Sequence, residues 1–193
     1  MSTYLGNSNN IFNWGKIITH LDKIKHPAFI EGKLIGTGFG SDEYPTYPEE
    51  IEHDLKILKK LTDANYNLDA SQWYLYRAGE HYNNSLAESI AEYYKIKIKL
   101  GWISIFRLDP GCSAPMHFED GVMEEDRQTT ARIFIQMSPP ENGQVLIIDS
   151  EVLHNVPSGD AYRWDHFLQE HAAANCSMNP WYFAFLQGVR TDL

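Results

Sequence analysis

The second half of the chain contains a series of short stretches rich in β-branched and aromatic residues, and this feature restricts the possible folds most. KIKLGWISIFRL, TARIFIQM, QVLIID and WYFAFLQ (97–108, 130–137, 144–149 and 181–187) are each bounded by Gly, Pro, Asn or Asp. Ile, Val, Phe, Tyr and Trp favour strands, whereas the bounding residues favour turns. Short strands separated by such turns predict an antiparallel sandwich or barrel over residues 96–193.

The first ninety-odd residues have a more helical pattern. Apolar residues recur at helical spacing within 14–24 and 48–61, and Ser85 and Glu88 form a capping box that opens a helix through about Tyr94. QWYLYR at 72–77 predicts a strand between these helices. We therefore expect one domain over 1–193, with a helix-rich part (1–95) covering one sheet face of the core.

One segment of the second half departs from the strand pattern. DAYRWDHFLQEHAAA (160–174) places Trp164, Phe167, Leu168 and His171 at helical spacing, and Asp160 could cap their helix. This pattern predicts a helix inserted among the strands.

Charge and composition exclude some classes of partner. The chain has 193 residues and a formal net charge of −10, which argues against binding nucleic acid or an anionic membrane surface. No segment approaches the roughly 18 apolar residues of a membrane span. MSTYLGNSNN lacks the basic and apolar regions of a signal peptide, and the two cysteines have no metal or redox spacing, so we expect a cytoplasmic protein.

A cluster of potential metal ligands follows a Pro-Gly turn in PGCSAPMHFED (110–120). In an extended chain His117 and Glu119 lie on the same side, while Asp120 faces the other side or begins a turn. Downstream, His154 follows the hydrophobic stretch QVLIID. Two histidines and one carboxylate form the facial triad of non-haem Fe(II) enzymes. We expect the other histidines, His171 among them, to be surface or packing residues.

The segments RLDPGCSAPMHFED and GQVLIIDSEVLHNVPSGDAYR resemble the double-stranded β-helix oxygenases that use Fe(II) and 2-oxoglutarate. They look most like the aspartyl/asparaginyl and prolyl hydroxylase branches, over about residues 100–163. The resemblance implies an α+β fold, with a jelly-roll (cupin-like) core and the N-terminal helices packed on one sheet. It also implies Fe(II) bound by His117, Glu119 and His154. The family usually has Asp where this chain has Glu119, so Asp120 stays the alternative carboxylate.

The resemblance further implies a cation for the distal carboxylate of 2-oxoglutarate, and Arg is the best bidentate partner. Arg163 stands where the family keeps this residue, in the barrel lining, and Arg132 in TARIFIQM is the other candidate. A helix over 160–174 would take Arg163 out of that lining and leave Arg132 as the candidate. The expected activity is hydroxylation of a peptide side chain or a small molecule. The alternatives are a cupin-type metal enzyme without 2-oxoglutarate and a non-catalytic jelly-roll binding or structural protein. The sequence leaves the substrate and the oligomeric state open.

Overall fold

The computed structural model describes residues 1–21, 29–30, 33–34, 59, 63, 74–79, 85–97, 102–117, 130–164 and 169–190. Strands dominate this part of the chain. The elements, in chain order, are β1 (Thr3–Asn7), α1 (Trp14–Leu21), β2 (Phe29–Ile30), β3 (Lys33–Leu34), β4 (Tyr74–Gly79), α3 (Ser85–Tyr93), β5 (Ile96–Lys97), β6 (Trp102–Leu108), β7 (Ser113–His117), β8 (Thr130–Gln136), β9 (Gln144–Ile148), β10 (Glu151–His154), β11 (Asp160–Trp164), β12 (His171–Asn175) and β13 (Trp181–Arg190).

Two antiparallel sheets form the body of the molecule. The large sheet has the strand order β1-β11-β8-β13-β6-β4, with β5 added to β13, and the small sheet has the order β10-β9-β12-β7. From β6 onward the chain passes between the two sheets at almost every connection, and only β9 and β10 form a hairpin within one sheet. This connectivity is that of a jelly roll, or double-stranded β-helix. The predicted fold class is therefore confirmed.

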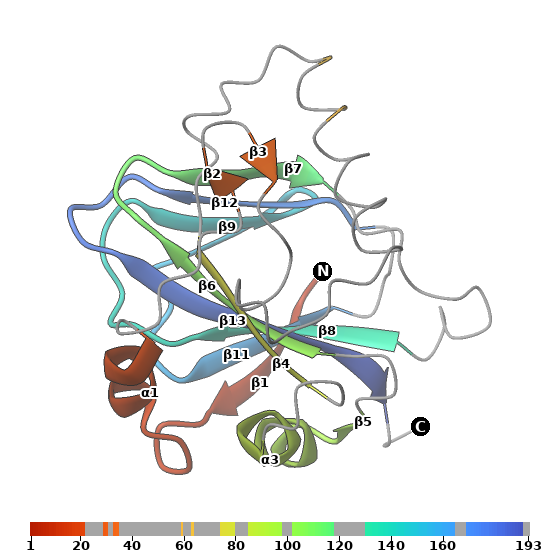
Figure 1. The fold of residues 1–193 in the computed structure, drawn as a ribbon. Helices are drawn as coiled ribbons and strands as arrows, with labels where there is room; N and C mark the ends of the chain where they lie inside the picture. Colours follow the sequence, from red (N-terminus) through yellow and green to blue (C-terminus); the bar gives the residue numbers. More distant parts are fainter. Residues whose placement is uncertain are drawn as a thin grey trace.

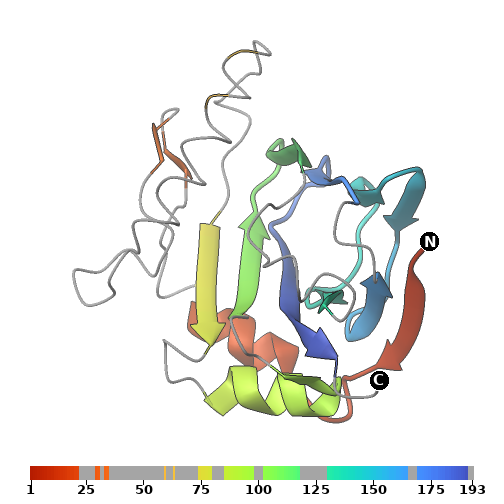
Figure 2. The ribbon, with the colours of Figure 1, turned by 90° about the vertical axis from the view of Figure 1, so that its right-hand side faces the viewer.

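The large sheet has a hydrophobic core on each of its faces. Its inner face packs against the small sheet through mainly aromatic residues, among them Phe134, Trp164 and Phe183. Its outer face packs against the helices through aliphatic residues, among them Ile133 and Ile135. Figure 1 shows α1 and α3 on the side of the large sheet that faces away from β9 and β12. Figure 2 shows β4, β6 and β13 side by side.

Most predicted elements are present, with shifted ends. The predicted strands correspond to β4, β5–β6, β8, β9 and β13, and two predicted helices correspond to α1 and α3. The predicted helix at 48–61 lies outside the described residues, apart from the single position 59. β1 was not predicted; it pairs with β11 and adds an edge strand to the large sheet. None of the described helices is long and apolar enough to cross a membrane.

The helix predicted over 160–174 is wrong. The segment contributes β11 to the large sheet and β12 to the small sheet. Trp164 and His171 are buried because they face each other from the two sheets, with ring centroids 6.0 Å apart. The two residues have helical spacing in the sequence because the chain crosses from the large sheet to the small sheet between them. Tertiary pairing overrides the local preference of HAAAN for helix.

Candidate functional site

Alternation along the strands decides which polar side chains enter the barrel. On β8, Phe134 belongs to the core between the sheets, and Arg132 and Gln136 share its side of the strand. Arg132 is 4% exposed, and its Nε donates to Gln187 Oε1 of β13 at 3.2 Å. The barrel interior therefore contains a guanidinium group next to an aromatic core.

His171, at the start of β12, is the buried histidine of the described interior. It is 2% exposed, and its ring meets those of Trp164 and Phe185 at centroid distances of 6.0 and 5.5 Å. Its Nδ1 lies 3.5 Å from the carbonyl oxygen of Gln169. Because a carbonyl can only accept a hydrogen bond, this contact favours a proton on Nδ1.

His117, the last residue of β7, is the register partner of His171. The two Cα positions face each other across neighbouring strands of the small sheet, and Ile148 of β9 faces His171 from the other side. Directly opposed Cβ atoms in such a pair lie about 5 Å apart. The fold thus brings His117 to His171, a histidine that the sequence analysis had assigned to packing.

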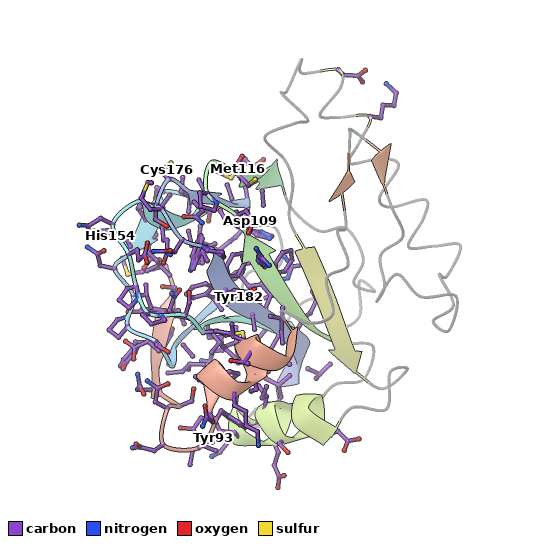
Figure 3. All side chains as sticks on the ribbon, turned by 60° about the vertical axis from the view of Figure 1, so that its left-hand side comes forward. Tyr93, Asp109, Met116, His154, Cys176 and Tyr182 are labelled. Carbon is purple, nitrogen blue, oxygen red and sulfur yellow. The ribbon has the colours of Figure 1, made fainter. Side chains whose placement is uncertain are left out.

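The structure does not bring His154 to His117. β10 and β7 are opposite edges of the small sheet, and His154 is level with Val145 of β9, three residues along from the row that contains His117. Three strand spacings across the sheet and three residues along it separate the Cα atoms of His154 and His117 by roughly 17 Å. His154 is also exposed, and Figure 3 shows it at the periphery of the molecule, apart from Met116, the neighbour of His117. Leu153, and not His154, packs against the core between the sheets.

The carboxylate candidates Glu119 and Asp120 lie outside the described residues. The choice between them therefore stays a prediction. Within the described ranges, no group of three His, Cys, Asp or Glu side chains could hold a metal ion. Any set of three such ligands that includes His171 therefore needs at least one side chain that the structure does not describe.

The two arginine candidates lie on opposite faces of the large sheet. Arg163 is the register partner of Ile133 and Thr3, and it shares its side of β11 with Ala161, which belongs to the helix-covered core. Trp164, next in the chain, faces inward and is the register partner of Arg132. Arg132 is therefore in the end of the barrel that contains His171, whereas Arg163 faces away from it.

This end of the barrel, which we call the open end, has accessible inward-facing residues. Phe185 and Gln187 of β13 are partly exposed, although their strand positions face the interior. Trp164 is 1% exposed, and its Nε1 has no hydrogen-bond partner among the described residues. A buried donor without a partner is costly in a purely structural core, and it suits a site that accepts a ligand.

At the other end, which we call the closed end, the buried polar groups bond to one another. Trp181 Nε1 donates to Gln136 Oε1 at 2.9 Å, and Gln136 Nε2 donates to the Ser138 carbonyl at 2.8 Å. Asn175, fully buried, donates to the carbonyl oxygens of Leu108 and Asn179 and accepts from Ser177. These contacts satisfy the buried polar groups of the closed end, and the open end is therefore the candidate site.

The sequence contained one weak indication that His171 faces the interior. In HAAAN, His171, Ala173 and Asn175 alternate as the inward positions of a strand. Alanine-rich sequence also favours helix, and alternation over five residues could not outweigh that preference.

Comparison with known proteins gives similarities of fold. No protein-family model matches the chain, and neither does any curated protein. Among solved structures, a cupin protein from Bacteroides fragilis shares 20% identity over 48% of this chain and 69% of its own, with a TM-score of 0.37. A predicted oxalate decarboxylase from Thermotoga maritima shares 13% identity over 62% of this chain and 82% of its own, with a TM-score of 0.40. A sugar phosphate isomerase of the cupin superfamily from Silicibacter pomeroyi shares 17% identity over 60% of this chain and 59% of its own, with a TM-score of 0.38. At this level of similarity, function has to be argued from the residues of this chain.

Proposed function

We propose that the open end of the barrel holds one Fe(II) ion between His117, His171 and a carboxylate from Glu119 or Asp120. The chain would then be a 2-oxoglutarate-dependent oxygenase that hydroxylates a peptide side chain or a small molecule. The observation that carries the proposal is the pairing of His117 with His171 in neighbouring strands, together with the burial of His171. Two imidazoles and one carboxylate are the ligand set that suits Fe(II) and leaves coordination positions open.

The residues around His171 fit such an ion. The contact of Nδ1 with the Gln169 carbonyl is the usual way in which a protein fixes the ring of a metal-bound histidine. The partly exposed residues of the open end provide access from solvent. With O₂ and 2-oxoglutarate, the iron would supply the oxidation, while the protein holds and orients the reactants.

Arg132 is the better candidate for the distal carboxylate of 2-oxoglutarate. It is buried in the same end of the barrel as His171, and its register partner Trp164 contacts the His171 ring. A buried guanidinium favours an anion nearby, and it can form two parallel hydrogen bonds with a carboxylate. Trp164 Nε1 could supply a further donor.

A cupin-type metal enzyme that does not use 2-oxoglutarate is the second candidate. The same pair of histidines supports it, because many reactions require only a metal ion in a jelly roll. A non-catalytic jelly-roll protein is the third, and it requires no metal at all. Arg132 separates the first candidate from the second, and metal binding separates both from the third.

The first experiment measures metal binding after anaerobic purification. We expect the wild-type protein to bind one equivalent of Fe(II) or Mn(II), and His117→Ala and His171→Ala to lose it. His154→Ala is the matched control and should retain the metal. Thermal unfolding shows whether each variant is folded, and His171→Gln replaces His171→Ala if the latter is not. Loss of the metal in His154→Ala, with retention in His171→Ala, would contradict the ligand set.

Glu119→Ala and Asp120→Ala, tested in the same way, decide which carboxylate binds. Only one of the two variants should lose the metal. Retention in both would show that the third ligand comes from elsewhere in the chain.

The second experiment measures 2-oxoglutarate affinity at equal metal occupancy. Arg132→Ala should bind 2-oxoglutarate well over tenfold more weakly, because a buried, charge-assisted contact is removed. Arg163→Ala should change affinity little, because Arg163 lies on the other face of the sheet. Succinate production that depends on His171 would support the oxygenase. Metal binding without 2-oxoglutarate affinity would support the cupin-type enzyme.

A further inference from the structure

The outward side of the small sheet is apolar although it is accessible. Alternation puts Leu146, Leu153 and Ala173 in the core between the sheets, so their neighbours along each strand point outward. The outward residues of β9, β10 and β12, which we call the small-sheet face, are Val145, Ile147, Val152, His154, Ala172 and Ala174. None of the six is buried, and only His154 is polar. An antiparallel sheet that faces water normally carries polar residues on that side.

The small-sheet face is also uncharged, in a chain whose formal net charge is −10. None of its six residues is Asp, Glu, Lys or Arg, whereas Asp149 and Glu170, at the ends of its strands, are exposed. Met116 of β7, which is 44% exposed, extends the apolar surface toward the edge of the sheet. Figure 1 shows this sheet on the side of the molecule away from α1 and α3. An apolar centre with a polar rim is the usual composition of a protein–protein interface.

The register of the strands shapes the small-sheet face into a ridge and a trough. Ile147 and Val145 stand on β9, and their register partners on β12 are Ala172 and Ala174. Large side chains on one strand therefore lie beside small side chains on the next. On β10, Val152 is the register partner of Ile147 and widens the ridge.

We propose that the small-sheet face binds the same face of a second copy of this chain, so that the protein forms a symmetric dimer. The two-fold axis runs between the two small sheets, parallel to their strands and midway between β9 and β12. This axis places β9 of one copy over β12 of the other, at the same height along the strands. Ile147 of each copy then lies over Ala172 of the other, and Val145 lies over Ala174. Each contact forms twice, as in every isologous interface.

The relief of the face is what favours a second copy as its partner, because each ridge meets a trough of the same length. A two-fold axis perpendicular to the strands would put β9 over β9 and bring Ile147 over Val145, ridge against ridge. Packed sheets lie about 10 Å apart with strand directions within about 30° of each other, which the parallel axis allows. That axis also leaves both open ends on the same side of the dimer, so the dimer does not cover the proposed metal site.

The size of the face sets the expected strength of the dimer. The four strands cover about 19 Å by 17 Å, so two copies bury about 1,000 Å² together once the rim is included. This area is in the range of weak complexes and predicts a dissociation constant on the order of micromolar. Because both copies are acidic, added salt should screen their repulsion and tighten the dimer.

Sedimentation velocity over a range of protein concentrations tests the proposal. It is done on metal-free protein, because the dimer does not depend on the proposed function. The wild-type protein should pass from monomer to dimer as the concentration rises, with more dimer at higher salt. Ala172→Glu puts a charge in the trough and Ile147→Lys puts one on the ridge, so each should weaken the dimer at least tenfold. Ile11→Glu is the matched control, because Ile11 is 60% exposed but lies before α1, and it should dimerise as the wild-type protein does.

Mixing the two charged variants tests the symmetry. In a mixed dimer, the lysine introduced by Ile147→Lys lies over the carboxylate introduced by Ala172→Glu, and the other Ile147–Ala172 contact is unchanged. The equimolar mixture should therefore dimerise at a concentration at which each variant alone is monomeric. Thermal unfolding shows that each variant is folded.

Three results would each overturn the proposal. The first is a wild-type protein that stays monomeric at every concentration. The second is a pair of folded variants that dimerise as the wild-type protein does. The third is a mixture that stays as monomeric as its two components.

Discussion

The two faces of the large sheet are built from alternate residues of the same strands, yet they differ in packing and in polarity. Within TARIFIQ, Ala131, Ile133 and Ile135 face the helices, and all three are at most 1% exposed. Phe134 and the polar residues Arg132 and Gln136 occupy the intervening positions, which face the small sheet. Along β8 the outer face is thus closed and aliphatic, whereas the inner face combines aromatic packing with polar groups. The contrast indicates that the outer face provides stability and leaves the inner face free to hold a site.

The largest expected effect is on the outer face. Ile135→Ala should lower the free energy of unfolding by about 3–4 kcal/mol, because it leaves a cavity in a fully buried core. Chemical denaturation measures the loss, and Ile11→Ala, at a position that is 60% exposed, is the control. The Mn(II) affinity of the folded protein should not change. A large loss of affinity would show that the two faces are coupled.

A smaller effect distinguishes the two ends of the inner face. Trp181→Phe and Trp164→Phe remove the same ring volume from fully buried positions. Only Trp181→Phe also breaks a hydrogen bond, the one to Gln136, and leaves a buried acceptor unsatisfied. It should therefore be less stable than Trp164→Phe by about 1–2 kcal/mol. Equal losses of stability would contradict the distinction between a closed end and an open end.

The smallest effect concerns alkaline pH. Burial raises the pKa of Tyr94, which packs against the outer-face core, from 10.0 to about 12. Because the folded protein favours the neutral phenol, this contribution to stability is fully present below about pH 10 and is lost as the pH rises through about 12. Tyr94 is only partly buried, so solvent screening limits the contribution to about 1 kcal/mol.

Urea denaturation between about pH 8 and pH 12 tests this expectation. Tyr94→Phe should lose less stability over that interval than the wild-type protein does. Burial also raises the pKa of Tyr162, which packs against the inner-face core, and Tyr162→Phe is the inner-face counterpart. If Tyr162→Phe reduces the loss of stability at alkaline pH more than Tyr94→Phe does, the inner face is the more strongly desolvated of the two.

Most of the core strands could be predicted from the sequence, because β-branched and aromatic runs between turn residues depend on local preferences. The family resemblance added the jelly-roll arrangement, which the pairing of the strands confirms. Local preference failed at 160–174, where burial from two different sheets produced helical spacing. It also gave no indication of β1, whose formation depends on pairing with β11.

Residue types and local patterns were enough to predict most strands, and they named candidate ligands and cations that stay predictions. Which of these groups meet depends on how the strands pair. His171 faces His117 and His154 does not, because strand order and register are set by pairing between segments far apart in the chain. Arg132 points into the barrel and Arg163 does not, because alternation assigns a face only once one residue of each strand has been placed. A shift of one residue in the register of β11 would put Arg163 on the inner face in place of Trp164. Nothing in the local sequence excludes that shift.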